Sequence, residues 1–85
     1  MSRLAAPPRH SLAQIRPQES VQIDPFVSDR LRSFCLSLGL AEGDEVRCVR
    51  SSAAVLVLKT FAGRTVLLEQ DWARFIAVHP SRMEA

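Results

Sequence analysis

The sequence predicts a mainly β domain, built as a small barrel with one inserted α-helix, and two patterns carry this prediction. In one stretch only, apolar residues recur with the period of a helix, because Leu31, Phe34, Cys35 and Leu38 lie at positions i, i+3, i+4 and i+7. After that stretch, every apolar run is short, rich in Val and Leu, and bounded by Gly or polar residues, as β-strands are. The 85 residues fit a single domain.

The predicted helix covers residues 29–38 and has recognisable signals at both ends. Ser28 is a suitable N-cap, and Asp29 in the first turn favours the positive end of the helix dipole. Gly39 follows the last apolar position and can adopt the left-handed conformation in which many helices end. Gly43 is expected to close a second turn four residues later. Both glycines are therefore predicted to be structural.

Strands are predicted on both sides of the helix. Alternating apolar residues and turn residues place them at residues 11–15, 19–23, 45–50, 54–61, 65–69 and 75–79. Ala62 and Gly63 should form a hairpin tip, and residues 70–74 a single helical turn. Short strands at this spacing are typical of a small barrel. We expect its core to contain Val21, Ile23, Leu31, Phe34, Cys35, Leu38, Leu40, Val46, Cys48, Leu56, Leu58, Val66, Leu68, Ala73, Ile76 and Val78.

The order and spacing of these turns resemble those of the FeoA family. The resemblance covers residues 11–79 and is carried by the segments 11–17, 38–40, 43–50 and 63–68, followed by Ala73, Ile76 and Val78. It implies a five-stranded SH3-like barrel in residues 10–80. Residues 1–9 would then be a flexible arm and residues 81–85 a loose tail.

The chain departs from the family pattern at three turns. Glu42 stands where the family usually has Pro, a loss that should cost a few tenths to about 1 kcal/mol. Gln18 follows Pro17 where the family often has Gly. The loop at residues 50–54 replaces a longer stretch that often contains Gly-Asp-Pro, so a contact made through that loop in relatives would have to be made differently here.

Composition excludes several classes of protein. The net charge of +2 is too small and too dispersed for a nucleic-acid-binding face, so no nucleic acid is expected as a partner. No run approaches the roughly 18 apolar residues of a membrane span, and no secretory signal is visible. We therefore expect a cytoplasmic protein without direct membrane insertion. In that compartment Cys35 and Cys48 should be reduced, buried thiols rather than ligands.

The sequence offers little that could perform chemistry. It has no phosphate-binding glycine loop and no nucleophile motif, so we expect no enzymatic activity and no required cofactor. The candidates for a metal site are His10 and His79, which flank the predicted core and could together bind a divalent transition metal, weakly or adventitiously. Two unrelated surface histidines are the simpler interpretation, because a true site needs three or four ligands.

The candidates for partner binding are two large aromatic residues, Trp72 and Phe26. Trp72 lies in the predicted helical turn, and Phe26 lies between a strand and the helix; each could be an interface anchor or simply part of the packing. Arg64 stands at the hairpin tip, where a solvated side chain is a better interpretation than an arginine finger toward a GTPase.

Function is implied by the resemblance rather than by a site. FeoA proteins are small accessory proteins of bacterial ferrous iron uptake, thought to act on the FeoB transporter, whose cytosolic part is a GTPase domain. An alternative is a regulatory module related to the SH3-like C-terminal domain of iron-dependent repressors. A binder of proline-rich peptides is disfavoured, because those grooves are lined by aromatic residues and this chain has no Tyr and one Trp. A homodimer is left open.

Overall fold

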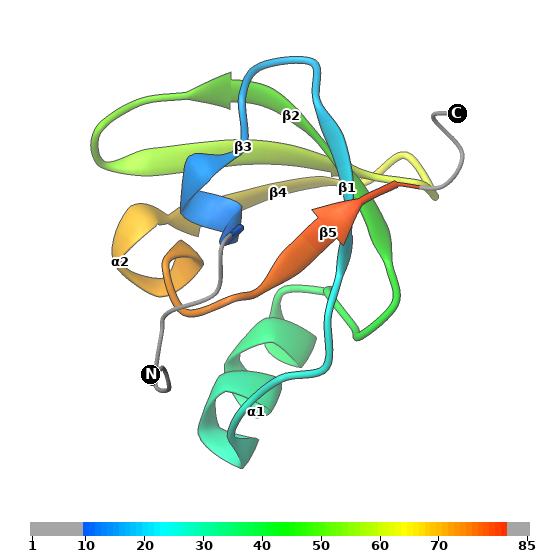
Figure 1. Cartoon of the computed structure of the whole chain (residues 1–85), viewed down its shortest axis with the longest axis vertical. Helices are drawn as coiled ribbons and strands as arrows, with labels where there is room; N and C mark the ends of the chain where they lie inside the picture. The colour runs from blue at the N-terminus through cyan, green and yellow to red at the C-terminus, as the bar shows by residue number, and fades with distance from the viewer. Residues whose placement is uncertain (1–9, 82–85) are drawn as a thin grey trace, which may run out of the picture.

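The computed structural model describes residues 10–81 and contains one five-stranded antiparallel sheet with one longer helix and two short helical turns (Figure 1). In chain order the elements are η1 (Leu12–Gln14), β1 (Ser20–Ile23), α1 (Asp29–Ser37), β2 (Glu45–Ser51), β3 (Val55–Thr60), β4 (Thr65–Glu69), α2 (Gln70–Ala73) and β5 (Val78–Pro80). The mainly β class with one inserted helix is confirmed. The predicted arm, residues 1–9, and residues 82–85 of the predicted tail lie outside the described residues.

The sheet curls into a barrel-like shape that is not closed. Its strand order is β4-β3-β2-β1-β5, so β4 and β5 lie at the two ends and are not hydrogen-bonded to each other. On β2, the pairing with β3 shifts between Cys48 and Arg50, which leaves Val49 as the extra residue of a β-bulge. A bulge bends its strand and increases its twist, which favours the curled shape. The turns η1 and α2 pack next to each other (Figure 1).

Two predicted strands are wrong: one does not form, and the other is shorter than predicted. Residues 11–15 form no strand, because the N–H of Ser11 donates to the side chain of Gln14 (3.1 Å) and the Gln14 N–H donates back to the Ser11 carbonyl (3.0 Å), which stabilises a helical turn instead. Ser11 makes only an isolated bridge with Ala77. The closing strand begins at Val78 rather than at residue 75, because the N–H of Ile76 still donates to the Ala73 carbonyl and prolongs the turn of α2.

The core matches the predicted one except at its edges. Fourteen of the sixteen predicted residues are buried, whereas Phe34 and Leu38 are half-buried because α1 lies beside one end of the sheet (Figure 1). Three further residues are buried that the sequence pattern does not predict: Leu12, Ile15 and Phe26. Two of them lie in and just after η1, where the assignment to a strand was wrong.

The helix α1 ends as its glycine predicts. Gly39 has φ +90°, its N–H donates to the Leu36 carbonyl (3.0 Å), and the Leu40 N–H donates to the Cys35 carbonyl (2.9 Å). These two bonds define a Schellman cap. Leu40 is fully buried, so the cap also fixes where the chain enters the core.

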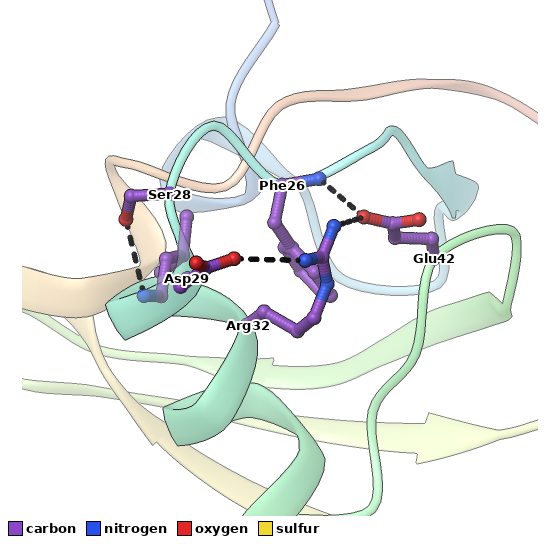
Figure 2. A network of polar contacts seen from close by, with 6 residues as sticks. Phe26, Ser28, Asp29, Arg32 and Glu42 are labelled. Carbon is purple, nitrogen blue, oxygen red and sulfur yellow. Dashed lines mark hydrogen bonds and ion pairs between the residues drawn. The ribbon is translucent and has the colours of Figure 1, made fainter.

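The start of α1 is tied to the loop that follows its end (Figure 2). Ser28 is the N-cap, with its Oγ accepting from the Leu31 N–H (3.1 Å). The Glu42 carboxylate accepts from the Phe26 N–H (2.9 Å) and from the Arg32 guanidinium (2.9 Å), which also donates to Asp29 (3.1 Å). The hydrogen bond from Arg32, followed by the one from the Phe26 N–H, holds the pKa of Glu42 below its ordinary value.

No helix within residues 10–81 combines the length and the apolar character needed to cross a lipid bilayer.

Candidate partner-binding surface

The most exposed large apolar side chain among the described residues stands at the tip of the β3–β4 hairpin. Phe61 is 83% exposed, directly after the last residue of β3. The turn beneath it is well ordered by hydrogen bonds: the Gly63 N–H donates to the Thr60 carbonyl (2.9 Å), and the Arg64 N–H donates to the Thr60 Oγ1 (3.1 Å). A tight turn therefore presents the Phe61 ring to solvent at a defined place.

Two hollows flank Phe61. One has a volume of about 320 Å³ and is lined on the sheet side by Ser20, Arg47 and Lys59. The other has a volume of about 290 Å³ and reaches the end of α1 at Gly39 and Arg64. Both hollows also share the lining residues Glu45, Thr60 and Phe61. Phe61 therefore lines two depressions, into which a partner that contacts this aromatic anchor can insert side chains.

Two cations lie side by side in the first hollow. Arg47 on β2 and Lys59 on β3 are direct cross-strand partners, and both side chains are exposed. Within the described part of the chain neither forms an ion pair. Like charges placed directly opposite each other destabilise a sheet, so this arrangement costs stability in the free chain. A carboxylate from a partner would relieve that repulsion.

The second hollow is organised by Arg64, whose guanidinium covers the end of α1. A methyl group built on Gly39 would lie only 3.1 Å from the Arg64 Nη1. Cations are favourable at a helix C-terminus because the last carbonyls carry partial negative charge. Asp44 also lines this hollow, but its carboxylate already accepts the Ala41 N–H (2.9 Å). The Arg64 side chain is exposed and lies beside Gly39. That it is a solvated hairpin residue rather than an arginine finger stays a prediction.

The two cysteines offer no reactive group at this surface or elsewhere. Cys35 and Cys48 are free thiols and fully buried. Burial raises the pKa of Cys35 to about 11 and also raises the pKa of Cys48. A thiol with a raised pKa is a poor nucleophile at neutral pH. The prediction that both act as small buried apolar residues is confirmed.

The two predicted metal-binding histidines lie near each other but are engaged differently. His10 and His79 line the same small hollow, about 40 Å³ in volume. The Nδ1 of His79 hydrogen-bonds the Asp24 carboxylate, and the Nε2 of His79 lies 3.3 Å from the Gln22 Oε1. Both ring nitrogens therefore have protein partners. Across residues 10–81, no group of three or more His, Cys, Asp or Glu side chains is placed to hold a metal ion. A site at this pair stays a prediction.

The two predicted anchor residues are both packed against the protein. Phe26 is buried in the core, so its ring is not presented at the surface. Trp72 is half-buried and stacks on Phe34, with ring centroids 4.0 Å apart and an interplanar angle of 13°. Phe61 is not among the predicted anchors, because its position at the end of an apolar run predicts the last residue of a strand. The available signal was a large aromatic residue directly before the turn residues Ala62 and Gly63.

Neither protein-family models nor curated protein sequences match this chain. Several solved structures share its fold. The crystal structure of an iron uptake regulatory protein (FeoA) has a TM-score of 0.76 at 15% identity, over 85% of this chain and 97% of that one. The solution structure of the FeoA protein from Chlorobium tepidum has a TM-score of 0.67 at 14% identity, over 84% of this chain and 70% of that one.

A manganese-dependent transcriptional repressor in complex with manganese is also similar, with a TM-score of 0.75 at 18% identity. That match covers 91% of this chain but only 39% of the repressor. The chain is therefore a small domain with an SH3-like fold. More particularly, its fold is FeoA-like, as the resemblance in sequence predicted. At these identities the likeness establishes the fold and leaves the function to be argued.

Proposed function

We propose that this protein is a non-catalytic, cytosolic accessory module of bacterial ferrous iron uptake, which acts by binding the cytosolic GTPase domain of the FeoB transporter. The proposal is supported by the FeoA-like fold together with a surface suited to a protein partner. Fold alone does not define a function, because the same architecture serves different roles. The surface at the hairpin tip supplies the argument from the residues of this chain itself.

The single observation that carries the proposal is the exposure of Phe61 between two hollows. A phenylalanine that is 83% exposed buries little apolar area in the fold, whereas aromatic residues are enriched among the anchors of protein interfaces. The neighbouring Arg47 and Lys59 supply charge that can orient a partner bearing carboxylates. An accessory protein that binds transiently needs only a small surface of this kind.

The test is the affinity of the chain for the cytosolic domain of the FeoB protein from the same organism, measured by calorimetry. Phe61→Ala should weaken binding by about tenfold or more, since loss of an anchor typically costs over 1 kcal/mol. Phe75→Ala is the matched control, because Phe75 is also exposed (59%) but lines neither hollow. It should bind as the wild type does. Equal affinities of all three chains would contradict the role of this surface.

A cellular test addresses the function itself. In a strain whose only ferrous iron route is FeoB, loss of this protein should slow uptake under iron limitation, and Phe61→Ala should restore uptake less well than Phe75→Ala. Normal uptake without the protein would contradict the accessory role even if binding is observed.

The second candidate is a regulatory module like that of the metal-dependent repressors, favoured by the TM-score of 0.75 to a manganese-dependent repressor. This role predicts changed transcription of metal-responsive genes, with the rate of uptake per transporter unchanged. Measuring transcript levels and uptake in the same deletion strain separates the two candidates.

A further inference from the structure

The two ends of the sheet are protected unequally. The free edge of β5 is covered, since the Val78 N–H donates to the His10 carbonyl (3.0 Å) and the Leu12 N–H donates to the Ile76 carbonyl (2.8 Å). β5 also contains Pro80, a residue that blocks further pairing. β4 is a five-residue end strand, Thr65–Glu69, with no Pro, Lys or bulge, and Glu69 at its end is its one charged residue. An edge with so little protection along its first four residues is open to pairing with another strand.

The pairing of β4 with β3 defines which groups face outward. The Thr60 N–H donates to the Arg64 carbonyl, and the Gln70 N–H donates to the Ala54 carbonyl. These two bonds fix which residue pairs along β3 and β4 are hydrogen-bonded and which are not. In an antiparallel pair every second residue bonds its neighbour. Thr65 and Leu67 therefore direct their N–H and C=O groups away from β3. Within residues 10–81, neither has a backbone hydrogen bond beyond that ladder.

The side chain of Leu67 adds an apolar element to this edge. Leu67 is 63% exposed on the outer face of the sheet, directly opposite the half-buried Val57 of β3. Val49, the bulged residue of β2 on the other side of β3, is also exposed. An exposed apolar side chain on an unprotected edge is the arrangement from which strands associate.

We infer that β4 pairs with β4 of a second copy of this chain, in antiparallel orientation and with Leu67 on the two-fold axis. The strand is self-complementary in that register: Leu67 meets Leu67 of the second copy, and Thr65 meets Glu69, so a hydroxyl can donate to a carboxylate. No like charges face each other. A shift of two residues would instead place Glu69 against Leu67. This complementarity identifies a second copy as the occupant.

The edge is short, so the dimer is expected to be weak. Five residues on each copy bury less than the roughly 1,200 Å² of a stable interface. Dissociation constants in the micromolar range or weaker follow, and association should appear only as concentration rises. The residues involved differ from those that line the hollows beside Phe61. The inference therefore stands apart from the proposed function.

The experiment is sedimentation equilibrium of the full chain from about 10 µM to about 1 mM. The wild type should move toward twice the monomer mass over that range. Leu67→Lys and Leu67→Glu should each stay monomeric, because they place like charges against each other across the axis, and an equimolar mixture of the two should dimerise again. Leu36→Lys, at an exposed leucine of α1, is the control and should behave as the wild type.

Circular dichroism of each variant checks that the fold is kept. A wild type that stays monomeric at about 1 mM overturns the inference and would leave the edge open to a strand of another protein. Dimerisation of either charged variant alone, or failure of the mixture to recover, overturns the placement of Leu67 on the axis.

Discussion

Gln18 holds a backbone conformation that suits glycine. Its φ is +74°, in the left-handed region that is costly for a residue with a Cβ atom, and among the described residues other than glycine it alone has a positive φ. Its N–H donates to the Cys48 carbonyl (2.7 Å), so the turn is held in place by β2. The sequence comparison with the FeoA pattern marked this position as one where Gly is common, and the backbone explains why.

Replacing Gln18 by glycine should therefore stabilise the fold. Gln18→Gly removes the strain of the left-handed conformation and is expected to raise the free energy of unfolding by about 0.5–1 kcal/mol, after the greater entropy of glycine in the unfolded chain is subtracted. Gln18→Ala keeps the Cβ atom and should bring no gain. Urea denaturation of the three chains measures the difference. A glycine variant no more stable than the alanine variant would show that the strain is negligible.

Glu42 illustrates how a departure from a family pattern can be compensated. It replaces a proline, yet its carboxylate joins the Phe26 N–H to the Arg32 guanidinium (Figure 2). Its pKa lies below the ordinary value of 4.5, so the network contributes stability above pH 4.5, and this contribution is lost as the pH falls through the lowered pKa.

Glu42→Gln should consequently be less stable than the wild type at pH 7, because the amide can still accept the Phe26 N–H but no longer carries the charge that pairs with Arg32. Below pH 4.5 the gap should narrow, since the wild-type carboxyl also loses its charge there. Thermal denaturation of both chains between pH 7 and pH 3 measures this difference in stability. A gap that does not change with pH would assign the effect of the substitution to something other than charge.

At the scale of elements, the end of α1 and the tip of the β3–β4 hairpin meet where the Arg64 side chain lies beside Gly39. Gly39 and Gly43 both have positive φ, +90° and +85°, as the sequence analysis predicted from their turn roles. The surroundings differ, because a Cβ on Gly39 meets the Arg64 guanidinium whereas a Cβ on Gly43 meets nothing within 4 Å. The Arg64 guanidinium of the hairpin therefore lies next to the helix cap, which predicts a coupling between the two elements.

This coupling can be measured with alanine substitutions. Gly43→Ala should cost roughly 1 kcal/mol from backbone strain alone, and Gly39→Ala should cost more because Arg64 must move. In an Arg64→Ala background the excess cost at Gly39 should disappear. Chemical denaturation of the four variants completes the cycle. If Gly39→Ala costs more than Gly43→Ala by the same amount with and without Arg64, the contact between residue 39 and Arg64 does not contribute to stability.

Elements with a repeating pattern were predictable, and elements defined by single hydrogen bonds were not. The periodicity of Leu31 and Cys35 gave the helix, and the alternation along β3 and β4 gave the hairpin, because burial repeats along them. The segment 11–15 was misassigned, since its turn depends on the Ser11–Gln14 hydrogen bonds, which have no periodic signature. The candidate site was missed for a similar reason: the exposure of Phe61 depends on what the rest of the fold leaves uncovered.

At the scale of the whole molecule, some charged side chains form ion pairs and others lie next to a like charge. Arg32 pairs with both Asp29 and Glu42, whereas Arg47 and Lys59 lie opposite each other beside the hollow at Phe61 and form no ion pair within residues 10–81. Residues that lower the stability of the free chain are expected where binding repays the cost. The net charge of only +2 makes this local arrangement, rather than the overall field, the feature that would guide a partner.

If the hollow binds an acidic segment of the FeoB cytosolic domain, the affinity should fall as salt rises, because exposed charge pairs are screened over about 8–10 Å at physiological ionic strength. Lys59→Glu should weaken binding by more than tenfold while leaving the stability of the chain equal to or above that of the wild type, since it replaces repulsion of Arg47 by attraction. Arg30→Glu, an exposed cation of α1, makes the same change in net charge away from the hollow and should have little effect. Calorimetric titrations at low and high salt compare the three chains. Equal weakening by both substitutions would assign the effect to net charge, whereas an unaltered Lys59→Glu complex would place the interface on another face of the barrel.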